Sequence, residues 1–293
     1  MIKNELKRCF KSIYSIVMPI ICVVPILFSY YFTWVEQKEL LNTLNSGAVD
    51  VDIDRVKQIY EGYNGFTYWI GFLASSDFYM VFVIAVSMLA GLLVASKEYK
   101  LRLDGLGNFI ITRADYSKMT WSILTANILY VISILFAVFV FMTMLSLFFF
   151  PVEKNAAITV CLNMQNPTIQ KCIGFIVIHF SKLMIYMICC MMLSYGLSIL
   201  LNNKYWCSLT GLFLYFGPLV IVSILGQLLG GVSSNIVNHL SAFVPDRFLL
   251  SSVEFYATER INWADEFVLP VFLIVVVFFI MNIYLVRGKK AYL

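Results

Sequence analysis

Three polar side chains recur on one face of an apolar segment near residue 180. His179, Lys182 and Tyr186 are separated by three and four residues, which places them on one side of an α-helix. Lys182 is the only charged residue between Lys171 and Lys204. A charge deep in a membrane is costly and marks a candidate pathway, whereas a Lys near a helix end extends its ammonium to the lipid headgroups. Both alternatives stay open: a lined pathway, or an interfacial anchor.

Residue patterns that support catalysis are not found in the sequence. The chain has two His, and neither stands in a recognisable nucleophile–base or metal-ligand motif. It contains no Gly-x-x-x-x-Gly-Lys phosphate loop, so any nucleotide-driven work would need a second chain. We therefore expect a non-catalytic protein without a metal or cofactor of its own.

The composition indicates an integral membrane protein. Apolar residues make up 61% of the 293 residues and charged residues 13%, whereas a soluble domain has about 25% charged residues. The apolar runs are long and continuous, which predicts helices rather than a barrel of short alternating strands. These features exclude a soluble enzyme, and the net charge of +4 is too small to indicate a nucleic-acid partner.

The uncharged runs predict an all-α integral membrane fold with a single transmembrane domain over residues 1–293. A helix needs about 20 residues to cross a bilayer. Six spans are expected near 13–35, 78–96, 120–148, 173–201, 206–229 and 267–286. Residues 1–12 form an amphipathic pattern with four basic residues, which predicts an interfacial helix on anionic lipids. Drawn in this way, the spans contain no Asp or Glu, which counts against an ion-driven carrier.

The distribution of basic residues predicts that both termini are cytoplasmic. The segments on the side of the termini hold 13 Lys and Arg and four acids, whereas the opposite side holds seven basic residues and 13 acids. Lys and Arg are concentrated in cytoplasmic loops of membrane proteins. The outer segments are then 36–77 and 230–266. Asp50, Asp52, Asp54 and Glu61 in the first could attract a cation, or they form an ordinary solvated acidic cap.

The inner loop 97–119 has an unusual pattern. It is charged at both ends, but Leu101, Leu103, Leu106 and Phe109 lie between them. A connecting loop with ordinary cytoplasmic charge would explain the Lys and Arg but not the apolar middle. The pattern favours a short amphipathic helix that rests on the membrane or in the groove of a partner.

The six-span plan, the amphipathic start and this loop resemble the membrane subunit of ABC transporters of the ABC-2 type. These permeases carry a Glu after the second span, then a Gly, then a hydrophobic stretch that ends in Thr-Arg, followed by a polar turn and a Lys. The residues that match in order are Glu98, Gly105, Ile110-Ile111-Thr112-Arg113 and Tyr116-Ser117-Lys118. Leu106 and Ala114 depart from the pattern, since many members have Thr and Pro there.

The resemblance implies a function. A separate ABC ATPase, which would bind ATP and Mg²⁺, docks on the cytoplasmic face of a bacterial plasma membrane and moves the spans to export a cargo. The ATPase-coupling residues implied by the motif are Glu98, Gly105, Phe109, Thr112, Arg113, Tyr116 and Lys118. The cargo would be hydrophobic or amphipathic, for example an antimicrobial peptide or a drug. Two alternatives remain: a non-transporting scaffold or sensor that recruits an ATPase, and an ion-driven carrier.

The resemblance also implies a second six-span subunit, which pairs through the first and fifth spans. Gly226 and Gly230 form a Gly-x-x-x-Gly pattern on the fifth, a spacing that allows two helices to approach closely. The alternative is that these glycines serve a bend or the start of a loop. On the outer side, Cys161 and Cys172 could form a disulfide or fill apolar positions as free thiols.

Overall fold

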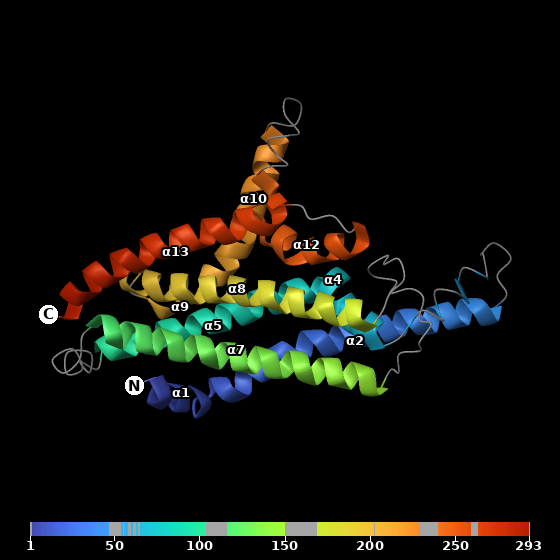
Figure 1. Cartoon of the computed structure of the whole chain (residues 1–293), viewed down its shortest axis with the longest axis horizontal. Coiled ribbons are helices and arrows are strands. Elements are labelled where there is room, and N and C mark those ends of the chain that lie inside the picture. Colours follow the sequence, from blue (N-terminus) through green and yellow to red (C-terminus); the bar gives the residue numbers. More distant parts are fainter. Residues whose placement is uncertain are drawn as a thin grey trace.

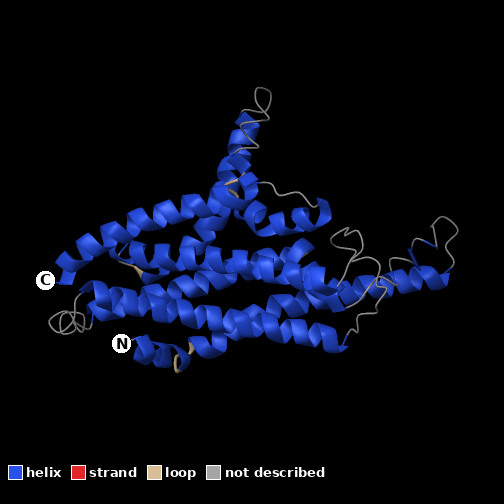
Figure 2. Ribbon diagram, in the orientation of Figure 1, coloured by secondary structure: helices blue, strands red, loops and turns tan. Residues whose placement is uncertain are grey.

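The computed structural model describes residues 2–46, 65–103, 116–149, 169–201, 203–228, 240–258 and 263–292, with positions 54, 56, 57, 60 and 63. Helices account for nearly all of these residues, and no strand occurs among them (Figure 2). The helices are α1 (Ile2–Phe10), α2 (Tyr14–Ser46), α4 (Gly65–Ser75), α5 (Asp77–Leu103), α7 (Tyr116–Phe149), α8 (Ile169–Leu201), α9 (Lys204–Ser208), α10 (Thr210–Leu228), α12 (Pro245–Thr258) and α13 (Trp263–Tyr292).

Six of these helices are long and apolar enough to cross a membrane, as the sequence predicts. They are α2, α5, α7, α8, α10 and α13. Because a bilayer offers no hydrogen-bond partners, a spanning segment must satisfy its backbone groups internally, as a helix does. The helices α2, α5, α7, α8 and α13 lie roughly along one direction, and the two ends of the chain lie at the same end of this bundle (Figure 1).

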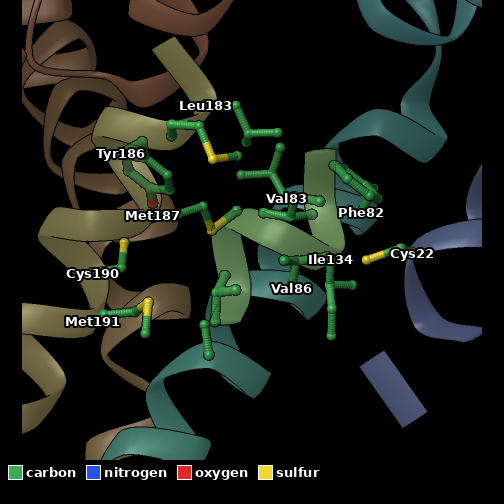
Figure 3. Packing of buried hydrophobic residues seen from close by; sticks show 14 of the residues in the cluster. Cys22, Phe82, Val83, Val86, Ile134, Leu183, Tyr186, Met187, Cys190 and Met191 are labelled. Atoms are coloured by element: carbon green, nitrogen blue, oxygen red, sulfur yellow. The ribbon is translucent and has the colours of Figure 1, made fainter. Parts of the chain in front are cut away.

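The core of the bundle forms around α8, which contacts α5 and α13 extensively. Met187 and Met191 of α8 are fully buried, and Met187 points toward Val83 of α5 (Figure 3). Flexible Met side chains fill irregular gaps between helices. With 67% of its most apolar stretch buried, α8 is the central helix.

Two helices lie in segments that the sequence analysis treated as outer connections. The segment 36–77 holds the end of α2, which continues to Ser46, and the short helix α4. Trp69 of α4 is fully buried and packs edge-on against Phe139 of α7 at 5.1 Å. Part of this predicted outer segment therefore belongs to the packed core. The segment 230–266 holds α12, which contacts α8 and α13.

The helix α10 differs from the other spans. It rises away from the bundle in Figure 1, and only 11% of its apolar stretch is buried. Thr210, Gly211 and Tyr215 at its start are buried, whereas Val220, Ile221 and Ile224 are exposed. Among the described residues, therefore, only the first turns of α10 are buried against other helices.

Candidate functional site

Lys182 lies in a buried polar cluster that joins three helices. Its ammonium Nζ is 2.5 Å from Glu266 Oε1 on α13 and donates to Ser251 Oγ on α12 at 2.6 Å. The hydroxyl of Ser251 in turn donates to the Phe248 carbonyl at 2.8 Å, so its lone pairs are available to the ammonium. We call Lys182, Ser251 and Glu266 the Lys182 cluster. A buried charge persists only where it is paired and hydrogen-bonded, and the cluster meets that condition.

The side chain of Lys182 is buried and its ammonium is paired. The side chain is 8% exposed, and its ammonium ends at the Glu266 carboxylate. An aromatic face adds to its surroundings, since Nζ lies 5.7 Å from the centre of the Phe248 ring. Such a contact attracts a cation. Lys182 therefore links α8 to α12 and α13.

The other two candidate pathway residues lie on the same buried face of α8. His179 is fully buried, with its ring 5.0 Å from that of Tyr79 on α5. Tyr186 is also fully buried and lies two turns beyond His179 along α8, beside Cys190 (Figure 3). The helical spacing thus brings the three residues to one face, and each of them is buried.

A second contact fixes α12 near the Lys182 cluster. The Tyr215 hydroxyl of α10 donates to the Asp246 carboxylate in the first turn of α12. The buried start of α10 and the start of α12 are thereby joined. Four helices, α8, α10, α12 and α13, meet around these two polar contacts.

The predicted coupling residue Glu98 is buried at the opposite end of the bundle. Its carboxylate is fully inaccessible and accepts a hydrogen bond from the Tyr195 hydroxyl of α8 at 3.1 Å. The Tyr195 ring lies 4.8 Å from that of Tyr284 on α13, which stacks on Tyr116 of α7 at 6.1 Å. We call Glu98, Tyr116, Tyr195 and Tyr284 the Glu98 cluster. Both ends of the inner loop therefore meet in one buried cluster.

The remaining coupling residues fall into two groups. Lys118 is exposed, two residues after the buried Tyr116. Gly105, Phe109, Thr112 and Arg113 lie outside the described residues. Glu98 faces inward, so it does not offer its carboxylate to a partner at the surface. A role for Glu98 in coupling would act through the packing of α5 against α8 and α13.

The amphipathic start of the chain forms α1 and docks on α7 through a polar contact. Lys97 Nζ of α5 donates to Asn127 Oδ1 of α7 at 2.8 Å and lies 2.8 Å from Cys9 Sγ of α1. Cys9 is fully buried, whereas Ile2 is exposed. Only part of the apolar face of α1 therefore packs against the other described helices. Ile2 and Phe10 are left available to a lipid surface.

One expectation about the spans was wrong. The sequence analysis drew spans that contain no Asp or Glu, but the candidate spans in the structure include Glu98 in Asp77–Leu101 and Glu266 in Glu266–Arg287. The predicted ends were placed at the first charged residue, whereas the helices continue beyond it. The absence of acids therefore no longer counts against an ion-driven carrier.

Several residues of these polar contacts were not identified from the sequence. Tyr215 lies on α10, Asp246 and Ser251 lie on α12, and Glu266 lies on α13; a physical argument could have found Glu266. A single Lys in an apolar helix requires a buried partner, and Glu266 is an acid at the start of another span. Tyr195 and Tyr284 of the Glu98 cluster carry no such signal, because Tyr is common throughout this chain, whereas Tyr116 belongs to the predicted coupling motif.

The remaining predicted positions are only partly described. Gly226 is half-buried on α10, and Gly230 lies outside the described residues. Cys172 is a free, buried thiol, and Cys161 lies outside the described part of the chain. Within that part, no group of three or more His, Cys, Asp or Glu could hold a metal ion.

Comparison with known proteins gives no assignment: no family model matches the chain, and no curated protein or solved structure does either.

Proposed function

We propose that this chain is the membrane-spanning subunit of an ATP-driven exporter of the ABC-2 type. A separate ABC ATPase would bind ATP and Mg²⁺ and dock at the inner loop 97–119 on the cytoplasmic face of a bacterial plasma membrane. The cargo moved outward would be hydrophobic or amphipathic. The chain itself would then supply the path and the moving helices, not the hydrolysis.

The observation that carries the proposal is the convergence of both ends of the inner loop on the Glu98 cluster. Glu98 lies near the start of the loop and Tyr116 near its end. Glu98 accepts a hydrogen bond from Tyr195 of α8, and Tyr116 stacks on Tyr284 of α13. A push on the loop would therefore reach α5, α7, α8 and α13 at once. Packed interiors resist deformation, so such a push would displace whole helices rather than be absorbed locally.

A further observation supports the second subunit. The helix α10 leaves most of its apolar surface uncovered by the rest of the chain, and Gly226 lies on that part of it. Helices in membranes associate through close packing at small residues. We propose that a second copy, or a related six-span chain, packs on α10.

A reconstituted system tests this function. The chain would be purified with the ATPase that accompanies it and placed in vesicles with a fluorescent amphipathic cationic peptide. We expect Mg²⁺- and ATP-dependent accumulation of the peptide that vanadate abolishes. ATP hydrolysis without accumulation would instead indicate a scaffold or sensor that only recruits the ATPase.

One observation favours an ion-driven carrier as a second candidate. The Lys182 cluster places an acid and a base in contact between two candidate spans, and buried ionisable groups of this kind form ion relays in carriers. In the same vesicles, a proton gradient without any ATPase would then drive accumulation. If the gradient has no effect and ATP is required, the carrier is excluded.

A further inference from the structure

A thiol and an ammonium from two different helices meet at the end of the bundle where both chain termini lie (Figure 1). Cys9 Sγ of α1 lies 2.8 Å from Lys97 Nζ of α5, and Lys97 also donates to Asn127 Oδ1 of α7 at 2.8 Å. The thiol donates to the same amide oxygen at 3.3 Å. Three side chains from three helices therefore converge on one point, and Lys97 is the first residue of the inner loop 97–119.

The amide of Asn127 holds the sulfur and the nitrogen in this arrangement. Its Nδ2 donates to the Ile123 carbonyl of the same helix at 2.8 Å, so Oδ1 is the atom that faces the other two side chains. Cys9 and Asn127 are both fully buried. Because the thiol proton points to the amide oxygen, a lone pair of the sulfur is left for Lys97. The packing of the helices therefore sets the separation of the two reactive atoms.

Both reactive groups are available for chemistry with each other. Among the described residues, Lys97 pairs with no carboxylate, and Cys9 is a free thiol. The Tyr130 hydroxyl of α7 is buried without a hydrogen-bond partner in this part of the chain, and it lies within electrostatic reach of Cys9. The Tyr130 ring also packs edge-on against Phe10, the neighbour of Cys9, at 5.0 Å. An unused donor next to the thiol suits a small oxygen-containing reactant.

We propose that Cys9 and Lys97 form a reversible covalent bridge when a peroxide reaches the thiol. The sulfur attacks the peroxide, the O–O bond breaks, and one water leaves as the sulfenic acid of Cys9 forms. Lys97 gives one proton to water, and its amine then attacks the sulfur. The S–O bond breaks, a second water leaves, and an S–N bond joins the two side chains. The sulfur supplies the two electrons that reduce the peroxide.

The bridge ties α1 to the start of the inner loop. In the reduced chain α1 is held mainly by its contacts with α7, and most of its residues are exposed. A short helix with few buried contacts opens locally at low cost, which admits a peroxide to the thiol. The S–N bond prevents this opening and removes the charge of Lys97. A small thiol attacks the sulfur and restores both side chains. The site needs neither an ATPase nor a cargo, so it stands apart from the proposed export function.

Mass spectrometry of the purified full chain tests the proposal. The chain in detergent would be treated with hydrogen peroxide and digested. We expect a linked pair of peptides that contain Cys9 and Lys97 and have together lost two hydrogen atoms, with no oxygen added. Dithiothreitol should return both peptides to their original masses. Oxidation of Cys9 beside an unmodified Lys97 would overturn the proposal, and so would the absence of any change at both residues.

Three variants show whether the geometry selects Lys97. Lys97→Arg keeps the charge, but a guanidinium stays protonated, so the bridge should be absent and Cys9 should carry added oxygen instead. Lys100→Arg changes an exposed residue one turn further along α5 and should bridge like the wild type. Asn127→Leu removes the positioning amide and should lower the yield of the bridge about fivefold. A bridge to Lys100 in the wild type, or an unchanged yield in Asn127→Leu, would contradict the proposal.

Discussion

The helices α8 and α10 are both apolar enough to cross a membrane, but their surroundings are opposite. The apolar stretch of α8 is 67% buried and that of α10 11% buried. On α8 every polar residue of the predicted face is enclosed, and Lys182 has its partners on α12 and α13. On α10 only residues of the first turns are buried in the described part of the chain. The apolar composition of a helix therefore indicates that it enters the membrane. Its polar contacts with other helices indicate whether it packs inside the bundle.

The largest expected effect on stability comes from breaking the ion pair between Lys182 of α8 and Glu266 of α13. Lys182→Met leaves the Glu266 carboxylate without its ammonium, and removing one partner of a buried pair costs about 3–5 kcal/mol. Because Glu266 is 21% exposed, we expect the lower end of that range. Thermal unfolding in detergent measures it. Lys182→Met with Glu266→Met should recover most of the loss, whereas Lys7→Met on α1 should have no effect. An unchanged unfolding temperature in Lys182→Met would contradict the role of the cluster.

The next largest effect on stability is expected at the buried start of α10. A Cβ at Gly211 would lie 2.8 Å from Ser87 Cβ of α5, whereas a Cβ at Gly217 would meet nothing within 4 Å. Gly211→Ala should therefore destabilise the chain by about 1–3 kcal/mol through overpacking. Gly217→Ala on the same helix should be neutral or slightly stabilising, because Ala is the better helix former. Equal unfolding temperatures for the two variants would show that α10 does not begin against α5.

The uncovered part of α10 should affect association rather than folding. Truncating Ile221 and Ile224 to Ala removes exposed side chains, so thermal unfolding of the single chain should change little. If a second subunit packs there, self-association in detergent or vesicles, measured by energy transfer between labelled chains, should weaken about fivefold. Phe141→Ala on α7, which is also exposed, is the control. The pairing through α10 fails if the two changes weaken association equally.

A small effect on stability is expected at the Glu98 cluster. Glu98→Gln keeps the shape and an oxygen that can accept from Tyr195, so the free energy of unfolding should change by no more than about 1 kcal/mol, the scale of one hydrogen bond. Thermal unfolding again measures the change, with Glu98→Leu as the variant that removes the acceptor. If Glu98→Gln lowered the free energy of unfolding as much as Lys182→Met does, α5 would depend on a charge pair, as α8 does.

The helical class and the number of spans were predictable because they depend on composition and on run length. The six predicted spans correspond to six candidate spanning helices, and the pattern of residues 1–12 predicted α1. The spacing of His179, Lys182 and Tyr186 also placed them correctly on one face. These inferences use local periodicity, which a single sequence contains.

The partners of those residues were not predictable in the same way. That Lys182 meets Glu266 depends on α13 packing against α8, which local periodicity does not encode. Helix ends were also misjudged, since a Glu such as Glu98 can stay inside a helix when a Tyr from another helix accommodates it. The helix α4 was missed because an 11-residue apolar stretch is too short to span a membrane, although Trp69 and its neighbours were a usable signal for burial.

The central claim, that the chain is moved through its inner loop by a separate ATPase, is tested most directly by photo-cross-linking in cells. A benzophenone amino acid would replace Phe109 in the loop, or Phe148 at the far end of α7, which is 82% exposed. The account predicts that ultraviolet light joins position 109, but not position 148, to a protein that carries a Gly-x-x-x-x-Gly-Lys-Ser/Thr motif. Capture of lipid alone at position 109, or of the ATPase at position 148 instead, would contradict it.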